Sequence, residues 1–137
     1  MKSLGEMEDA IVGNYEGIED NMMKYEQLIQ EGNDLVPMPE MYRQDTYLIK
    51  GCQSKVWLAP ELKDGHLYFY ADSNAQITKG IISLLVKLLN GRTPDEIENY
   101  SFDIIHRLGL KGMLSSQRSN GLDSMINKLK YFAKNLR

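Results

Sequence analysis

The stretch ITKGIISLLVKLLNG, residues 77–91, decides the fold. Apolar side chains fall on nearly every face of the helix that it predicts, and a helix of this kind is normally buried inside a protein. The stretch is shorter than a membrane span and carries Lys79 and Lys87, so we expect a central core helix. Gly91 follows the apolar run and is a residue type that commonly ends helices.

A small antiparallel sheet is predicted just before this helix. The stretches SKVWLAPEL (54–62) and HLYFYAD (66–72) read as two strands, and Asp64-Gly65 between them is the strongest short signal for a hairpin turn. TYLIKG (46–51) predicts a further strand. We therefore expect a sheet of about three strands, which is too small to be stable unless helices pack on it.

Further helices are predicted on both sides of this region. Apolar residues recur at spacings of three and four from Met7 to Ile29, and Gly17 indicates a break into two helices. Three helices are expected after the core helix: one over residues 93–100, one from residue 102 that ends at Gly109, and one over residues 122–136. The sequence therefore predicts an α+β fold, with one domain over residues 1–137.

Composition excludes several classes of function. The chain has 137 residues, of which 26% are charged, and no apolar run of membrane-spanning length. Residues 1–45 hold three basic and eleven acidic side chains, which argues against a nucleic-acid binder. No signal peptide is predicted, and a single cysteine fits a reducing compartment. We expect a cytoplasmic protein that binds neither nucleic acid nor a membrane.

The single cysteine, Cys52, lies in GCQSKVW, residues 51–57. Composition alone favours a buried and inert thiol, because free cysteine is among the most buried residue types. Its predicted position favours a functional thiol, since a loop between two strands is where functional side chains concentrate. Gly51 permits a tight turn there and lets another molecule approach the backbone.

The chain offers few residues for a metal or cofactor site. His66 and His106 are far apart in sequence and, with one cysteine, are too few for a zinc site, so we expect no metal. No glycine-rich loop precedes a helix in the pattern that binds phosphates, and no other cofactor is expected. Asp72 ends a predicted strand, and we expect it to cap the core helix together with Ser73 or Asn74.

Three motifs in order resemble those of the SufE family of sulfur-acceptor proteins. They are GCQSKVW (51–57), ADSNAQITKGIISLL (71–85) and LSSQRSNGLDSM (114–125). KYEQLIQEGNDLVPMPE (24–40) is similar to the family's helix and proline turn, so the resemblance covers residues 18–135. The chain departs from the family at Asn21, Lys50 and Asn74, where Trp, Pro and a second Asp are common.

The resemblance implies a curved small sheet with helices on one side, the SufE/IscU-like fold. It implies that Cys52 accepts persulfide sulfur from a SufS-like cysteine desulfurase that depends on pyridoxal phosphate. The protein would stimulate that desulfurase and pass the sulfur to an iron–sulfur scaffold complex, with no cofactor of its own. The same resemblance places further residues around the cysteine: Gly51, Gln53, Ser54, Asp72, Ser73, Lys79, Arg118, Asn120 and Gly121.

Thiol chemistry adds expectations about the surroundings of Cys52. An apolar pocket would protect the resting thiol from oxidation, and we expect its neighbours to be Val56, Trp57, Leu84 and Leu88. Arg118 would either steady the exposed thiolate or tie the loop backbone to the rest of the protein.

Two other functions remain open, and the sequence leaves open whether the protein is an enzyme. The first is a thiol-dependent transferase or hydrolase, for which His66 and His106 are the only histidines that could act as the base. The second is an activator that binds a desulfurase without carrying sulfur. Removal of the two histidines would decide the first alternative, and a Cys52→Ser variant that still stimulates the desulfurase would favour the second.

Overall fold

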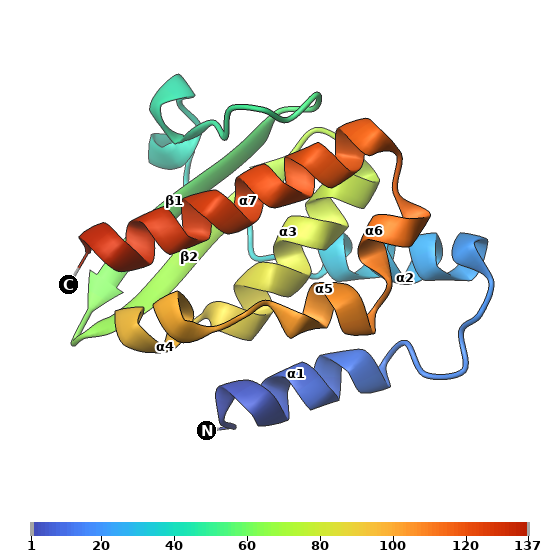
Figure 1. The fold of residues 1–137 in the computed structure, drawn as a ribbon. Coiled ribbons are helices and arrows are strands. Elements are labelled where there is room, and N and C mark those ends of the chain that lie inside the picture. Colours follow the sequence, from blue (N-terminus) through green and yellow to red (C-terminus); the bar gives the residue numbers. More distant parts are fainter. Residues whose placement is uncertain (1, 137) are drawn as a thin grey trace.

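The computed structural model describes residues 2–136, which form a two-stranded hairpin surrounded by helices (Figure 1). Met1 and Arg137, which belong to the predicted domain over residues 1–137, lie outside this range. The elements follow in the order α1 (Leu4–Gly13), α2 (Asn21–Asn33), the 3-10 helices η1 (Glu40–Tyr42) and η2 (Asp45–Tyr47), β1 (Val56–Lys63), β2 (His66–Ser73), α3 (Gln76–Leu89), α4 (Pro94–Asn99), α5 (Asp103–Arg107), α6 (Leu110–Met113) and α7 (Ser116–Asn135).

The predicted core helix is confirmed as α3. Leu84, Leu85 and Leu88 have no exposed surface, and the helix packs on β2 and on α2. In Figure 1, α7 crosses over α3 and the hairpin, whereas α1 lies along the opposite side of the molecule. The buried side chains form one cluster that extends from Ile11 to Ala133, so α3 lies at the centre of the packing.

Helices α2 and α3 cross in direct backbone contact. A Cβ atom on Gly80 would lie 2.0 Å from the carbonyl oxygen of Leu28, and one on Gly32 would lie 3.0 Å from the amide nitrogen of Gly80. One turn further along, the Ser83 hydroxyl donates a 2.7 Å hydrogen bond to the carbonyl of Glu31. Only glycine allows this approach, because any side chain at position 80 meets backbone atoms that have no room to move.

The predicted hairpin is confirmed. β1 and β2 pair in antiparallel register, from Val56 opposite Ser73 to Lys63 opposite His66. Asp64 and Gly65 both have positive φ, at 52° and 79°, as a two-residue type I′ turn requires. One face of the hairpin is buried against the helices, and its buried members are Val56, Leu58, Leu67, Phe69 and Ala71.

The expectation of about three strands is wrong for residues 46–51. Within the part of the chain that the structure describes, the sheet has two strands. The segment begins in η2 and pairs with β1 through a single bridge, between Leu48 and Trp57. The chain then turns at Gly51, where φ is +89°, so too few extended residues remain to form a strand. The 3-10 helices instead cover part of the other face of the hairpin, where Tyr42 stacks on Tyr70.

The C-terminal third differs from the prediction in two places. The helix expected to end at Gly109 is confirmed as α5, but a further short helix that was not predicted, α6, follows Gly109, whose φ is +64°. The last helix begins at Ser116, earlier than the expected 122, because the hydroxyl of Ser115 caps it by accepting from the Arg118 amide. The polar run after Ser115 is therefore helical. None of the helices within residues 2–136 has the length and hydropathy needed to span a bilayer.

Replacement of Gly80 by alanine should destabilise the protein by roughly 1–3 kcal/mol or more, because the added Cβ forces α2 and α3 apart. Gly112→Ala is the matched control, since nothing lies within 4 Å of a Cβ at that position. Urea unfolding of both variants measures the effect. If Gly80→Ala and Gly112→Ala shift the midpoint equally, the close crossing of the two helices is contradicted.

Candidate functional site

Cys52 lies in a loop that the hairpin anchors at its C-terminal end. The amide of Lys55 donates to the Asn74 side-chain oxygen at 3.0 Å, and the Asn74 amide donates to the Lys55 carbonyl at 3.3 Å. At the other end, the Ile49 amide donates to the carbonyl of Val56 at 2.8 Å. The loop of residues 50–54 is therefore held by hydrogen bonds at both of its ends, and it turns at Gly51.

The Cys52 thiol is half-buried against α7. Its Sγ atom donates to the carbonyl oxygen of Gly121 over 3.6 Å. Burial raises the pKa of the Cys52 thiol. The thiolate is the nucleophilic form, so in this conformation the cysteine is mostly protonated and poorly reactive at neutral pH.

A pocket of about 80 Å³ surrounds the thiol. It is formed by the loop, α3 and α7 together, and its lining residues are Cys52, Gln53, Ser54, Thr78, Ile81, Gln117, Arg118, Gly121 and Met125. Among the residues that the family resemblance placed around the cysteine, four besides Cys52 line this pocket: Gln53, Ser54, Arg118 and Gly121. Arg118 contributes the one charged side chain among the lining residues.

The four apolar neighbours expected from the sequence, Val56, Trp57, Leu84 and Leu88, do not line this pocket. The first half of α3 faces the thiol, through Thr78 and Ile81, and the later leucines pack in the core. On α7 the missed residues are Gln117 and Met125. They lie four residues before and after Gly121, so helical spacing around the glycine motif could have identified them.

Asp72 lies in a separate ion cluster outside the cysteine pocket. Its buried carboxylate contacts the Arg43 guanidinium and lies 3.4 Å from the Lys79 ammonium, and it accepts from the Ser73 amide at 2.8 Å. Arg43, which the sequence did not single out, also lies over the Trp57 ring at 5.2 Å. The Arg43–Asp72 ion pair thus ties the segment that precedes the loop to the end of β2, and Lys79 joins the same carboxylate to α3.

The expected cap of the core helix is wrong. The N-cap position of α3 is Ala75, which has no side-chain cap. The Ser73 hydroxyl accepts from the Ala75 amide at 3.2 Å, and Asn74 bonds to Lys55 across the loop. Ser73 therefore stabilises the turn before α3, and Asn74 stabilises the cysteine loop. The carboxylate of Asp72 pairs with Arg43 and Lys79 instead.

The two remaining predicted residues, Gly51 and Asn120, both meet Ser124. Gly51 packs on the Ser124 side chain, whose hydroxyl donates to the Asn120 carbonyl at 3.1 Å. The side chain of Asn120 itself is exposed and outside the cysteine pocket.

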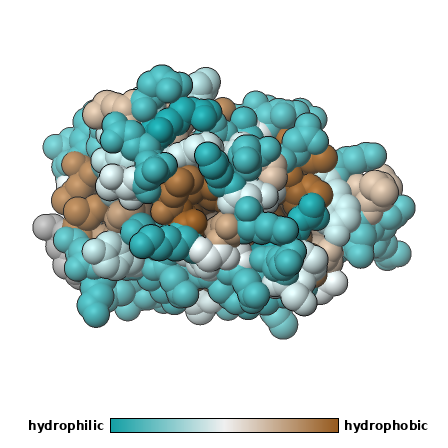
Figure 2. All heavy atoms as spheres, turned by 90° about the horizontal axis from the view of Figure 1, so that it is seen from above, coloured by the Kyte–Doolittle hydropathy of each residue, from teal (hydrophilic) through white to brown (hydrophobic). Residues whose placement is uncertain are grey.

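A groove of about 770 Å³ runs beside the loop, between residues 45–50 and α7. Its lining is mixed, with the basic side chains of Lys50 and Lys128, the acidic side chain of Asp45 and apolar groups that include Leu48 and Ile49. Viewed from above Figure 1, the molecule shows apolar patches in a band across its middle, bordered by hydrophilic side chains (Figure 2). The groove therefore leaves open surface next to the cysteine loop.

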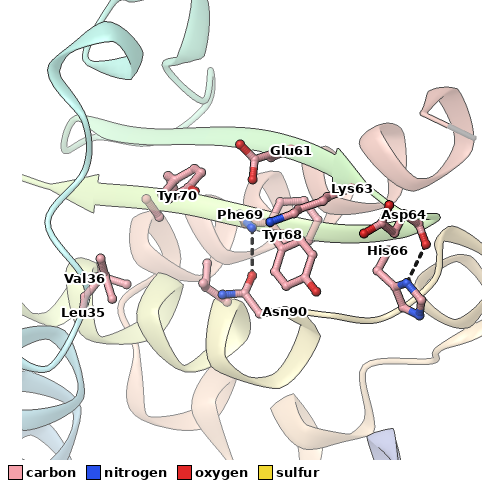
Figure 3. Close-up of a pocket in the computed structure, with 12 residues that line it drawn as sticks. Leu35, Val36, Glu61, Lys63, Asp64, His66, Tyr68, Phe69, Tyr70 and Asn90 are labelled. Atoms are coloured by element: carbon pink, nitrogen blue, oxygen red, sulfur yellow. Dashed lines mark hydrogen bonds between the residues drawn. The ribbon is translucent and has the colours of Figure 1, made fainter.

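Another hollow, of about 700 Å³, lies between the hairpin, the end of α3 and residues 35–36 (Figure 3). It contains none of the residues that the family resemblance placed around the cysteine. His66 lies at its edge near the hairpin turn, with Nδ1 2.9 Å from the Asp64 carbonyl, and the amide of Phe69 donates to Asn90 at 2.8 Å. His106 belongs to α5. Neither histidine lines the cysteine pocket.

Comparisons with known proteins agree with these motifs. The model of the SufE family, described as an Fe–S metabolism associated domain, matches residues 9–133. An uncharacterised SufE-like protein of Synechocystis is 35% identical over 119 residues, which cover 87% of this chain and 75% of that protein. A second, from Rhizobium meliloti, is 33% identical over 127 residues, which cover 89% and 91% of the two chains.

Two more comparisons extend the likeness. SufE-like protein 1, chloroplastic/mitochondrial, of Arabidopsis thaliana is 35% identical over 117 residues, 85% of this chain and 32% of that longer protein. The solution structure of a hypothetical protein from Thermus thermophilus superimposes with a TM-score of 0.76 at 15% identity, over 93% of each chain. At that identity the likeness concerns the fold alone.

The raised pKa of Cys52 predicts how the free protein reacts with a thiol alkylating reagent. Because burial disfavours the thiolate, the rate should reach half its maximum at a pH above the value of about 8.5 for free cysteine. The same protein unfolded in urea is the control, and its midpoint should return to the ordinary value. A folded midpoint equal to the unfolded one would contradict the shielding of the thiol.

Proposed function

The chain belongs to the SufE family, whose domain is associated with Fe–S metabolism, and on this basis we propose that it is a sulfur acceptor. Cys52 takes sulfur from a SufS-like, pyridoxal phosphate-dependent cysteine desulfurase and passes it on for iron–sulfur cluster assembly. The observation that supports this most directly is the position of the one thiol, on a loop that turns at Gly51 and is held at both ends.

The transfer is a thiol–persulfide exchange. The Cys52 thiolate attacks the outer sulfur of the donor's persulfide, the S–S bond of the donor breaks, and the donor thiolate leaves. The proton lost by Cys52 balances the one taken up by the donor thiolate, so the products are a persulfide on Cys52 and a free donor thiol. No electrons are gained or lost overall. The protein therefore supplies position and protection, and needs no cofactor for this step.

The exchange requires a thiol that is protected at rest and accessible during transfer. A permanently exposed persulfide-forming cysteine would oxidise further, and a permanently buried one could not reach the donor. The half-buried thiol with its raised pKa fits the resting form. We infer that docking of the desulfurase favours an open loop, as a partner does when it binds one of two conformations more tightly.

The position of Arg118 on α7 also supports this proposal. Its side chain is exposed and lines the thiol pocket. A guanidinium at the rim of the pocket is placed to interact with the thiolate once the loop moves outward. Arg118 would thus act mainly on the open form.

The groove beside the loop supports a partner that approaches from the Lys50 side. It combines open apolar surface with two lysines, a mixture that suits a protein surface better than a small molecule. Stimulation of the desulfurase follows from the chemistry, because removal of its persulfide frees that enzyme's cysteine for the next turnover. The iron–sulfur scaffold complex would then receive the sulfur from Cys52.

The alternative of a thiol-dependent hydrolase or transferase is less well supported. A cysteine nucleophile of that kind needs a base within hydrogen-bond reach, and neither His66 nor His106 lines the cysteine pocket. An activator that does not carry sulfur would use the same partner surface, and only the behaviour of Cys52 separates it from a carrier.

Cys52→Ser should abolish sulfur uptake while leaving the fold intact, because the serine hydroxyl cannot form a persulfide. The protein is mixed with a SufS-like desulfurase and cysteine, and its mass is measured for one added sulfur atom. A His66→Gln/His106→Gln double variant is the control and should take up sulfur normally. Uptake by Cys52→Ser would refute the carrier, and full stimulation of the desulfurase without uptake would favour the pure activator.

Alkylation of Cys52 should be slow in the free protein and faster once the desulfurase is bound, because only the open loop exposes the thiolate. The rate is followed by mass at the Cys52 peptide, which separates it from reaction at the desulfurase. Serum albumin at the same concentration controls for crowding. Equal rates with and without a desulfurase that is shown to bind would mean that the loop does not open on docking.

A further inference from the structure

We propose that Ser124 is a positioning residue for the cysteine loop. Together with Gly121 it forms a seat on α7 that contacts Gly51 and Cys52. The size of the Ser124 side chain sets how far the loop closes. This inference rests on the proposed sulfur transfer, since it names the contact that governs access to the same thiol. The seat is defined here as the side of α7 formed by Gly121 and Ser124.

The first contact is between Ser124 and Gly51. A Cβ atom built on Gly51 would lie 2.6 Å from Ser124 Oγ and 3.6 Å from Ser124 Cβ, so the glycine backbone rests directly on the serine side chain. The Ser124 hydroxyl donates to the carbonyl of Asn120 at 3.1 Å, which holds it in this orientation. A larger side chain at position 124 would have to occupy the space that Gly51 fills.

The second contact lies one helical turn earlier. A Cβ atom built on Gly121 would lie 3.4 Å from Cys52 Sγ and 3.9 Å from Cys52 Cα, and the thiol donates to the Gly121 carbonyl. Residues three apart lie on the same side of a helix. Two successive loop residues therefore meet two helix residues in order, the glycine on the serine and the cysteine on the glycine.

The two contacts couple the turn to the thiol. The loop turns at Gly51, with φ at +89°, and its far end is pinned by Lys55 and Asn74. A displacement of Gly51 away from Ser124 must therefore move Cys52, the next residue, away from Gly121 and out of its pocket. Ser124 also lines the groove beside Lys50, so it is accessible from the side on which a partner would dock.

Three variants compared with wild type test this seat, with Cys52 alkylation measured in the free protein. Ser124→Leu should raise the rate about tenfold, because the larger side chain displaces Gly51 and lets water reach the thiol. Ser124→Ala adds no bulk and should stay within about threefold of wild type. Asn127→Leu is the matched control, since Asn127 lines the same groove on α7 without contacting Gly51, and should leave the rate unchanged.

The pH profile of alkylation separates positioning from a loss of stability. In Ser124→Leu the midpoint should fall toward that of an ordinary thiol, because burial is what raises the pKa of Cys52. The charged groups around the loop stay the same in all variants: Arg118 of α7 lines the pocket, and Lys50 and Lys55 flank the cysteine in sequence, while α3 presents uncharged Thr78 and Ile81. Urea unfolding identifies any variant that is not folded, and Ser124→Val then replaces Ser124→Leu as a smaller change.

The outcomes distinguish a failure of the proposed seat from a failure of the proposed function. If folded Ser124→Leu, or Val in its place, alkylates at the wild-type rate with the wild-type midpoint, Ser124 does not position the loop. The same holds if Asn127→Leu has an equal effect. Alkylation needs no desulfurase, so a failure of wild type to accept sulfur would overturn the proposed function and leave the seat standing. Normal sulfur uptake with no effect at position 124 would overturn the seat alone.

Discussion

The packing of α3 between β2 and α2 is the contact on which the rest of the structure depends. A two-stranded hairpin is marginal in water, and it is stabilised here because its buried face lies on a helix that is apolar on nearly every side. The same helix meets α2 backbone to backbone at Gly80, so the two helices pack as closely as a glycine allows. The first half of α3 is thereby held at the cysteine pocket.

The candidate site is built from three parts of the chain that are distant in sequence. The loop contributes the thiol, α3 contributes Thr78 and Ile81, and α7 contributes Gly121 and its helical neighbours. A separate ion cluster, centred on Asp72, ties the segment before the loop to the hairpin. The loop is therefore short, is held at both ends and turns at Gly51.

This arrangement would meet two opposed requirements of the proposed sulfur transfer. Burial protects the thiol but raises its pKa and suppresses attack on a donor. A contact between a glycine and one serine side chain is small, so a partner can replace it at low cost in free energy. A seat of this kind would shield the thiol in part at rest and still let the loop open.

Local pattern was enough to determine much of the fold and of the site. The apolar run of α3, the Asp64-Gly65 turn and the break near Gly17 are set by neighbouring residues, and motif resemblance singled out Cys52, Arg118 and Gly121. Which elements contact one another was decided only by the tertiary structure. The segment 46–51 formed a single bridge, Arg43 reached Asp72, and Ser124 met Gly51, since each depends on the relative placement of elements far apart in the chain.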